Sequence, residues 1–372
     1  MGQSDSIKIL FFIESLHRGG KERRAVELMH YLLDNRSVEI LLVLTEPEIY
    51  YKSVLDLQVE VKILKRGKIK YDINLFKEFH SLCTKFKPDI IHAWGKMTTF
   101  YSIPAKLFLK IPLISNLVSD VEGRYKKLSF DPIFYQIDIL ASDHIISNSY
   151  AGLNAYKINN SKALVIPNGV RLERFQRNLD NQQLREELGI GPGPVITMVA
   201  SFTKYKDYDL FIDVAKEFDR MHIHSTFIGV GYGEDWHRIH DRVINERVNN
   251  VILTGLKNDV ESLIGISDIG ILCTYSEGIS NSVMEYMAMG KPVISTDLHG
   301  GSRELILHGE TGFCIERSLP ALREHINILL TDENLRLLMG CKGRERIWSS
   351  FSVEKMGAKY LDLYKNILNN GQ

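Results

Sequence analysis

Residues 269–297 read IGILCTYSEGISNSVMEYMAMGKPVISTD, and this stretch decides the fold. The apolar run 269–273 predicts a strand, Gly278 suits a turn, and the strong helix formers of 283–289 predict a helix. Pro292 cannot continue that helix, and a second apolar run follows it. Strand, turn, helix and strand in this order form the repeating unit of a parallel sheet that is covered by helices.

The same alternation of apolar runs and helical spacing extends over the whole chain. The predicted strands lie at 7–13, 38–44, 59–64, 90–93, 112–116, 144–147, 163–166, 195–200, 226–230, 251–254, 269–273, 292–295 and 312–315. A polar stretch at 171–183 interrupts the series, and 372 residues are more than one ordinary hydrophobic core holds. We therefore predict an α/β protein with two domains, residues 1–170 and 171–352.

The end of the chain predicts one more helix, over residues 353–372, with Ser352 as its N-cap. Met356, Tyr360, Tyr364 and Ile367 have the spacing of a single apolar stripe on this helix. Such a stripe must pack on something, and we expect the helix to return to the first domain.

The composition excludes several classes of partner. Lys plus Arg and Asp plus Glu both number 46, so the formal net charge is zero and we expect no nucleic-acid partner. No apolar run near the start is long enough for a signal peptide or a membrane span, which predicts a cytoplasmic protein. Residues 1–170 hold 23 Lys plus Arg against 18 Asp plus Glu. This excess is either a solvated surface or a weak attraction to an anionic membrane.

The turn before the predicted helix is a candidate anion site. It consists of Gly278, Ile279, Ser280, Asn281 and Ser282, among which Asn281 can cap the helix. Backbone N–H groups at a helix start are unpaired and lie at the positive end of the helix dipole. We therefore expect this turn to bind a diphosphate.

Two glutamates flank the turn. Glu277 precedes the helix and Glu285 lies about two turns inside it, so eight residues at about 100° each leave them about 80° apart. They can thus share one ligand. Beside a diphosphate a carboxylate is best used on hydroxyl groups, so we assign a sugar to Glu277 and a ribose to Glu285. The alternative for Glu285 is a solvated carboxylate on a helix surface.

The string from Glu277 to Glu285, followed by segments 287–297 and 301–304, resembles the retaining glycosyltransferases of family 4. The signature of that family is a pair of glutamates with seven residues between them. The likeness covers nearly the whole chain, and its further parts are Gly19-Gly20, 88–92, 166–170, Lys206, 229–233 and 309–313.

This resemblance implies a GT-B fold, in which two Rossmann-like domains face each other and a C-terminal helix crosses back to the first. The acceptor then binds mainly to the first domain and the nucleotide sugar mainly to the second. It also implies a donor site without metal or other cofactor, because basic side chains and amides neutralise the diphosphate.

Further residues take their expected roles from the same resemblance. Lys206 matches the lysine that contacts the donor phosphate, where an ammonium would stabilise the leaving charge. The family's arginine five residues earlier is replaced by Ser201, and Lys204 could supply the missing charge. Lys257 lies in a segment, 255–259, that resembles the loop holding the nucleotide base through main-chain contacts.

The first domain offers two such matches. Gly19 and Gly20 resemble the glycine turn whose amides approach the diphosphate, although a plain tight turn is the alternative. His92, at the end of a predicted strand, resembles one of two histidines that many relatives carry, and we expect it to contact the acceptor or the sugar. Trp94 takes the place of the second, where it either stacks on a sugar ring or packs in the core.

We therefore predict a retaining glycosyltransferase with Glu277, Lys206 and His92 as catalytic residues. It would move a sugar from a UDP- or GDP-sugar to a hydroxyl of a glycan or lipid-linked saccharide. One alternative is a GT-B nucleotide-sugar 2-epimerase, which would act without an acceptor. Another is a nucleotide-sugar-binding subunit without catalysis, suggested by Ser201 and Trp94, which depart from the family pattern.

Overall fold

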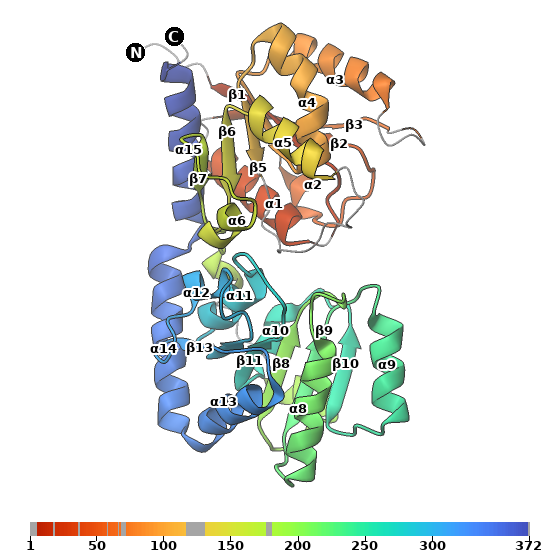
Figure 1. Ribbon diagram of the computed structural model, residues 1–372, viewed down its shortest axis with the longest axis vertical. Coiled ribbons are helices and arrows are strands. Elements are labelled where there is room, and N and C mark those ends of the chain that lie inside the picture. Colours follow the sequence, from red (N-terminus) through yellow and green to blue (C-terminus); the bar gives the residue numbers. More distant parts are fainter. Residues whose placement is uncertain are drawn as a thin grey trace. The chain divides into compact units, whose positions relative to one another are not determined.

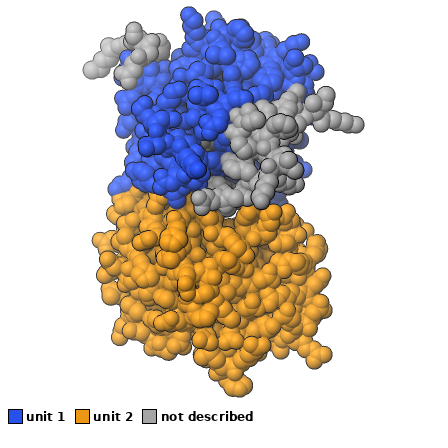
Figure 2. All heavy atoms as spheres, viewed as in Figure 1, with its two compact units in different colours: residues 1–169, 353–372 blue, residues 170–352 orange. Residues whose placement is uncertain are grey.

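The computed structural model describes residues 6–17, 19–35, 38–57, 59–65, 67, 72–116, 131–175 and 181–370. The chain divides into two compact units, shown in Figures 1 and 2. Unit 1 comprises Met1–Gly169 and Val353–Gln372, and unit 2 comprises Val170–Ser352. Within the described ranges, no helix has the length and apolar character needed to span a membrane.

Unit 1 is built on a parallel sheet with the strand order β3-β2-β1-β4-β5-β6-β7. The strands are β1 (Ile7–Ile13), β2 (Val38–Leu44), β3 (Glu60–Ile63), β4 (Ile90–Trp94), β5 (Leu113–Asn116), β6 (His144–Ser147) and β7 (Ala163–Val165). The helices are α1 (Gly20–Asp34), α2 (Ser53–Asp56), α3 (Ile73–Phe86), α4 (Lys96–Leu109), α5 (Asp131–Ala141), α6 (Tyr150–Ala155) and α15 (Val353–Asn370).

The interior strand β1 contributes to the two larger hydrophobic cores of unit 1. Successive side chains of a strand point to opposite faces of the sheet. Ile9, Phe11 and Ile13 accordingly pack with α1 and α15, whereas Leu10 and Phe12 pack with α3 and α4. Because helices cover both faces, the strand is apolar at every position except Lys8 rather than alternating, and this is the signal that made it predictable.

The C-terminal helix α15 belongs to unit 1, as the sequence predicts. Its stripe, from Met356 to Ile367, is buried in the same core as α1. Gly357 permits a close approach, since a Cβ there would lie 2.1 Å from Cδ1 of Tyr31 in α1. The Tyr360 hydroxyl also accepts a hydrogen bond of 3.0 Å from Nδ2 of Asn116, at the end of β5. Packing and hydrogen bonding thus fix the last helix to the first sheet.

Unit 2 repeats the design with the strand order β10-β9-β8-β11-β12-β13, again parallel. The strands are β8 (Val195–Val199), β9 (Thr226–Val230), β10 (Val251–Gly255), β11 (Ile269–Leu272), β12 (Val293–Ser295) and β13 (Gly312–Cys314). The helices are η1 (Leu172–Phe175), α7 (Asn181–Glu187), α8 (Tyr208–Arg220), α9 (Trp236–Asn245), α10 (Val260–Gly265), α11 (Asn281–Ala288), α12 (Ser302–Leu305), α13 (Leu319–Thr331) and α14 (Glu333–Ser350).

The helix that the opening motif predicts is α11. Gly290 ends it with a φ of +71°, a conformation that glycine adopts without strain. A Cβ on Gly340 of α14 would lie 2.0 Å from the Gly290 carbonyl oxygen, so α14 crosses directly over this helix end. One expectation is wrong in detail. Ser280 occupies the N-cap position, and Asn281 is the first residue of the helix.

The predicted strands agree closely with the sheets. β1, β2, β6 and β9 have the predicted bounds, β3 is one residue shorter at each end, and the other strands differ by one residue at one end. The two parallel Rossmann-like sheets confirm the predicted fold class. In both, the strand order reverses next to the first strand, between β1 and β4 in unit 1 and between β8 and β11 in unit 2. Ligands of open α/β sheets bind at the carboxyl ends of strands at such a reversal.

Candidate functional site

The reversal point of unit 2 brings together the loops that follow β8 and β11. The Tyr275 amide donates to the Tyr205 carbonyl at 3.1 Å, and the Asp207 amide donates to the Cys273 carbonyl at 3.0 Å. Lys206 itself forms an antiparallel bridge with Thr274. The backbone therefore holds Lys206 beside the segment that leads into α11.

Lys206 and Glu277 form an ion pair between Nζ and Oε2. Their side chains are only 13% and 18% exposed. Since water screens such a pair little, each charge orients the other. The structure thus joins two predicted site residues that lie 71 positions apart in the sequence.

Glu285 lies on the buried side of α11, and its side chain is 5% exposed. Nη2 of Arg174, in η1, lies 3.4 Å from Oε1 of Glu285, and Nε of the same guanidinium donates to Glu261 at 2.8 Å. One arginine thereby bridges two carboxylates. The alternative of a solvated helix carboxylate does not hold for Glu285.

Tyr286, the next residue, fixes the helix that carries Glu285. Its hydroxyl donates to the Thr197 carbonyl of β8 at 2.8 Å. Its ring lies over Gly270 of β11, where a Cβ would approach the ring to 2.5 Å. Glycine at this strand position therefore lets α11 pack closely on the sheet and sets the depth of Glu285.

The turn before α11 combines buried and half-buried residues. Ile279 is buried in the core beside α11, which anchors the turn. Ser280 is also buried, and its hydroxyl lies 3.1 Å from that of Ser282. No side chain caps the helix through the Ser280 position. The start of α11 lies at the carboxyl edge of the sheet, and the binding of a diphosphate there stays a prediction.

The loop after β12 packs behind Glu277. The Gly301 amide donates to the Glu277 carbonyl at 2.7 Å. A Cβ on Gly301 would lie 2.4 Å from the carbonyl carbon of Gly278, so the two loops touch backbone to backbone. Asp297 holds this loop, because its carboxylate accepts from the Ser302 amide at 3.2 Å. Burial raises the pKa of Asp297, and its hydrogen bonds and nearby Lys206 oppose that effect.

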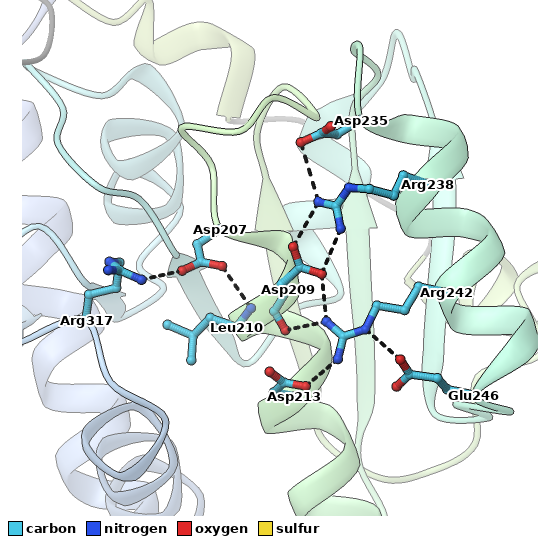
Figure 3. A network of polar contacts seen from close by, with 9 residues as sticks. All are labelled: Asp207, Asp209, Leu210, Asp213, Asp235, Arg238, Arg242, Glu246 and Arg317. Carbon is cyan, nitrogen blue, oxygen red and sulfur yellow. Dashed lines mark hydrogen bonds and ion pairs between the residues drawn. The ribbon is translucent and has the colours of Figure 1, made fainter. Parts of the chain in front are cut away.

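Asp207 and Asp209 form an Asp-x-Asp pair, a spacing of carboxylates that can hold a cation, and Figure 3 shows how each is engaged. Asp207 caps α8 by accepting from the Leu210 amide at 3.0 Å and pairs with Arg317 at 2.8 Å. Arg238 donates two hydrogen bonds to Asp209, at 3.0 and 2.8 Å. Both carboxylates therefore support the loop and α8.

Asp209 is in addition bound by Arg242, which also contacts Asp213 and Glu246 (Figure 3). Burial alone would raise the pKa of Asp209, but the two arginines hold it below its usual value. This network joins α8 to α9. Among the described residues, no group of three or more His, Cys, Asp or Glu side chains comes together as metal ligands.

Arg317 links the network to the site. Its guanidinium lies 3.9 Å from the ring centroid of Tyr275, two residues before Glu277, while it pairs with Asp207, the residue after Lys206. The Arg317 side chain therefore contacts both loops that carry the Lys206–Glu277 pair and holds them together.

The other two lysines predicted to bind the donor are more exposed than Lys206. Lys204 and Lys257 lie exposed on the loops after β8 and β10. Nζ of Lys204 lies 5.2 Å from the ring centroid of Tyr205. β10 is the edge strand, with β9 and β8 between it and β11. The contribution of these two lysines to donor binding stays a prediction.

In unit 1, Gly19 takes the N-cap position of α1 and Gly20 begins the helix. A Cβ on Gly19 would lie 2.0 Å from Oε2 of Glu22, which lies in the first turn of the helix. Glu22 is buried. The glycine turn thus lies against a carboxylate, a feature that the pattern of glycines alone did not predict.

The expected position of His92 is wrong. His92 is the middle residue of β4, not its last, and it is fully buried beneath α15, where Tyr364 covers it. The Tyr364 hydroxyl lies 2.7 Å from Nδ1 of His92. Burial lowers the pKa of His92 to about 3, so the ring is neutral near pH 7. Trp94 ends the strand instead and is also fully buried.

Sequence reasoning missed Arg174, Tyr275, Asp297 and Arg317. Each acts through a partner that is distant in the sequence or through a ring contact, and none lies in a spacing that marks it. For Tyr275 and Asp297 one indication of a role was available, because each lies in the loop that follows a strand, β11 or β12.

Comparison with known proteins agrees with this geometry. Residues 18–174 match the family described as Glycosyltransferase Family 4, and residues 180–346 match the family described as Glycosyl transferases group 1. The chain is 26% identical over 322 residues to an N-acetyl-alpha-D-glucosaminyl L-malate synthase of Bacillus anthracis, covering 81% of this chain and 80% of the relative.

A second relative is a UDP-Gal:alpha-D-GlcNAc-diphosphoundecaprenol alpha-1,3-galactosyltransferase of Escherichia coli, 26% identical over 80% of this chain and 82% of its own. Among solved structures, HepE of Anabaena has a TM-score of 0.85 at 19% identity, covering 97% of this chain and 100% of that one. The two family matches meet near the boundary between the units and together cover most of the sequence. The chain therefore belongs to the family 4, group 1 glycosyltransferases and has their GT-B fold.

Proposed function

We propose that the protein is a retaining glycosyltransferase that moves a hexose-type sugar from a UDP- or GDP-sugar to a hydroxyl acceptor, a glycan or a lipid-linked saccharide. The observation that carries this proposal is the Lys206–Glu277 pair beside the start of α11, with Glu285 buried eight residues on. A cation and two carboxylates at one reversal point offer separate partners for phosphate and for hydroxyl groups.

Each residue then has a chemical role. Lys206 and the amides at the start of α11 stabilise the charge that grows on the diphosphate as the glycosidic bond breaks. Glu277 accepts hydrogen bonds from the sugar and Glu285 from the ribose. The acceptor hydroxyl attacks on the face from which the diphosphate leaves, and the leaving phosphate takes its proton. Holding both reactants in place supplies much of the rate.

The relatives support the choice of donor and acceptor class. The Anabaena HepE structures contain UDP or UDP-glucose. The Escherichia coli relative is named for a UDP-sugar donor and a diphosphoundecaprenol-linked acceptor, and the Bacillus relative for L-malate. Both acceptor names denote molecules with an anionic group. No metal enters the proposal, because Lys206 and the helix start neutralise the diphosphate.

We also propose a weak contact with an anionic membrane through unit 1. Leu107 and Phe108 of α4 and Leu140 of α5 are 64%, 78% and 75% exposed. The ends of these helices adjoin, since Nζ of Lys106 donates to the Ala141 carbonyl. Exposed leucine and phenylalanine beside lysines suit a membrane surface that carries a lipid-linked acceptor. The basic residues at 124–127 lie outside the described residues.

This contact is testable by sedimentation with vesicles of phosphatidylcholine and phosphatidylglycerol at low salt. Phe108→Glu with Leu140→Glu should abolish binding. A matched control is Leu337→Glu with Leu338→Glu, which changes two exposed leucines of α14 in unit 2 and should bind as the wild type does. Failure of the wild type to sediment with the vesicles refutes the membrane contact.

The transferase proposal is tested by a thermal-shift screen of UDP and GDP sugars, because a ligand of the native state raises the melting temperature by mass action. The selected donor is then incubated with candidate acceptors, and the anomeric configuration of the product is read by NMR. Retention supports the proposal and inversion refutes it. An altered sugar from donor alone would indicate an epimerase, and donor binding without nucleotide release would indicate a binding subunit.

A further inference from the structure

Arg24, in the second turn of α1, is a buried cation that pairs with no carboxylate among the described residues. Its side chain is 3% exposed. Nη1 donates to Oδ1 of Asn168 at 3.0 Å, and the guanidinium lies 4.9 Å from the ring centroid of Trp94. Both partners are neutral, and no carboxylate of the described chain pairs with it. An uncompensated buried charge costs several kcal/mol, so this arrangement needs an anion to offset it.

The donors of Arg24 are arranged for an oxyanion. Nε and Nη2 are buried and make no hydrogen bond to the described protein, and the same is true of Nε1 of Trp94. Nε and Nη2 share the edge of the guanidinium whose two N–H bonds run parallel and fit two oxygens of a carboxylate or phosphate. All three groups are donors, so they need hydrogen-bond acceptors. Water can accept these bonds, but it leaves the charge uncompensated.

The hydrogen-bond donors of Arg24 and Trp94 lie at a position in the fold where ligands bind. Trp94 is the last residue of β4, and α1 follows β1. The strand order of unit 1 reverses between β1 and β4. The cluster of Arg24 and Trp94 therefore lies at the carboxyl edge at the reversal point, the position at which open α/β sheets bind ligands.

We propose that Arg24 and Trp94 bind an anionic oxygen group, a carboxylate or a phosphate, that belongs to the acceptor. This inference rests on the proposed function, whose donor site lies on unit 2, and on the expectation from the family resemblance that the acceptor binds mainly to the first domain. Because Arg24 is almost fully covered, its cover must open before the anion enters, and we expect association well below the usual range of 10⁵–10⁷ M⁻¹s⁻¹.

The test uses the full chain and titrates inorganic phosphate, and separately malonate, by calorimetry at constant ionic strength set with chloride. Arg24→Met replaces the guanidinium by an apolar side chain of similar volume. Trp94→Phe keeps an aromatic ring but deletes the Nε1–H donor. We expect saturable binding of at least one probe by the wild type. Arg24→Met should lose it, at least tenfold, and Trp94→Phe should weaken it about threefold to tenfold. Stronger binding of phosphate or of malonate identifies which group the acceptor carries.

Lys206→Met is the comparison variant, because it removes a cation of the donor site: it should lose only phosphate bound at that site and keep the binding that Arg24→Met loses. The inference is overturned if the wild type binds neither probe, if Arg24→Met binds as tightly as the wild type, or if only Lys206→Met loses binding. Displacement of the probe by UDP would assign the anion to the donor and equally refute it.

Folding and the proposed function are checked separately. Arg24→Met should melt no lower than the wild type in chloride, because replacing an unpaired buried charge by an apolar side chain is neutral or stabilising. It should also bind UDP with unchanged affinity. A wild type that binds neither UDP nor GDP would refute the proposed function, whereas an Arg24→Met variant that binds the probe as the wild type does refutes only this inference.

Discussion

Gly301→Ala offers a sharp test of how the site is held, because the contact it disturbs is between two backbones. A Cβ at position 301 would lie 2.4 Å from the carbonyl carbon of Gly278, 2.6 Å from its oxygen and 2.8 Å from its Cα. Ordinary contacts begin near 3.4 Å, so the two loops must separate by about 1 Å. Gly278 follows Glu277 directly, and the Gly301 amide donates to the Glu277 carbonyl. The displacement therefore reaches Glu277, the carboxylate that the proposed function makes catalytic.

A misplacement of about 1 Å in a catalytic group costs on the order of 10²-fold in rate. We expect kcat/KM for transfer from the donor identified in the screen to fall about 100-fold. The melting temperature should fall moderately, since overpacking costs about 1–3 kcal/mol. Gly191→Ala is the control, because a Cβ there meets nothing within 4 Å. It should stay within twofold of the wild type.

The assay is run well below the melting temperature of each variant, and UDP titration verifies that the protein is folded. Glu277→Gln removes the carboxylate completely, and its fall in kcat/KM is the value with which that of Gly301→Ala is compared. The reasoning is refuted if Gly301→Ala binds UDP and retains kcat/KM within about threefold of the wild type, because Glu277 would then tolerate the shift of its loop.

Three further changes probe the same architecture. Glu285→Gln should weaken UDP binding about tenfold or more in calorimetry through loss of a charge-assisted hydrogen bond, and unchanged affinity would exclude the ribose contact. Gly270→Ala should lower the free energy of unfolding in urea by about 1–3 kcal/mol, because a Cβ would approach the Tyr286 ring to 2.5 Å; an unaltered midpoint would show that α11 can shift freely. Burial raises the pKa of Asp138 to about 8, against 3.8 for an ordinary carboxyl, so the folded state retains a proton that the unfolded state has lost and stability falls as pH rises from about 4 to about 8. Asp138→Asn should reduce this slope, at most about 1.4 kcal/mol per pH unit, and an identical pH profile in urea unfolding would contradict the assignment.

The fold was predictable because helices cover both faces of each sheet. Strands that are almost entirely apolar, such as β1 and β9, can be identified from composition alone. The positions of Glu277 and Glu285 were predictable for a related reason, since both lie within one strand-turn-helix segment whose local geometry fixes them. The buried depth of Glu285 was not, because Gly270 and Tyr286 set it from the sheet.

His92 shows which features local sequence patterns do not predict. An apolar run indicates a strand but not which of its residues is the last, and β4 extends to Trp94, leaving His92 in the middle. The residue that covers His92, Tyr364, lies 272 positions later in the chain. Arg317 is similar, since its partner Asp207 is 110 residues away. Contacts of this range depend on the tertiary fold, and no local spacing signals them.

The central claim is that the start of α11 and Lys206 bind the diphosphate while Glu277 and Glu285 bind the sugar and the ribose. A crystal structure with the intact donor tests it most directly. The account predicts phosphate oxygens within hydrogen-bond distance of Lys206 Nζ and of amides at 278–282, with both carboxylates on hydroxyl groups. A diphosphate bound elsewhere, with the Lys206–Glu277 pair left as it stands, would contradict it.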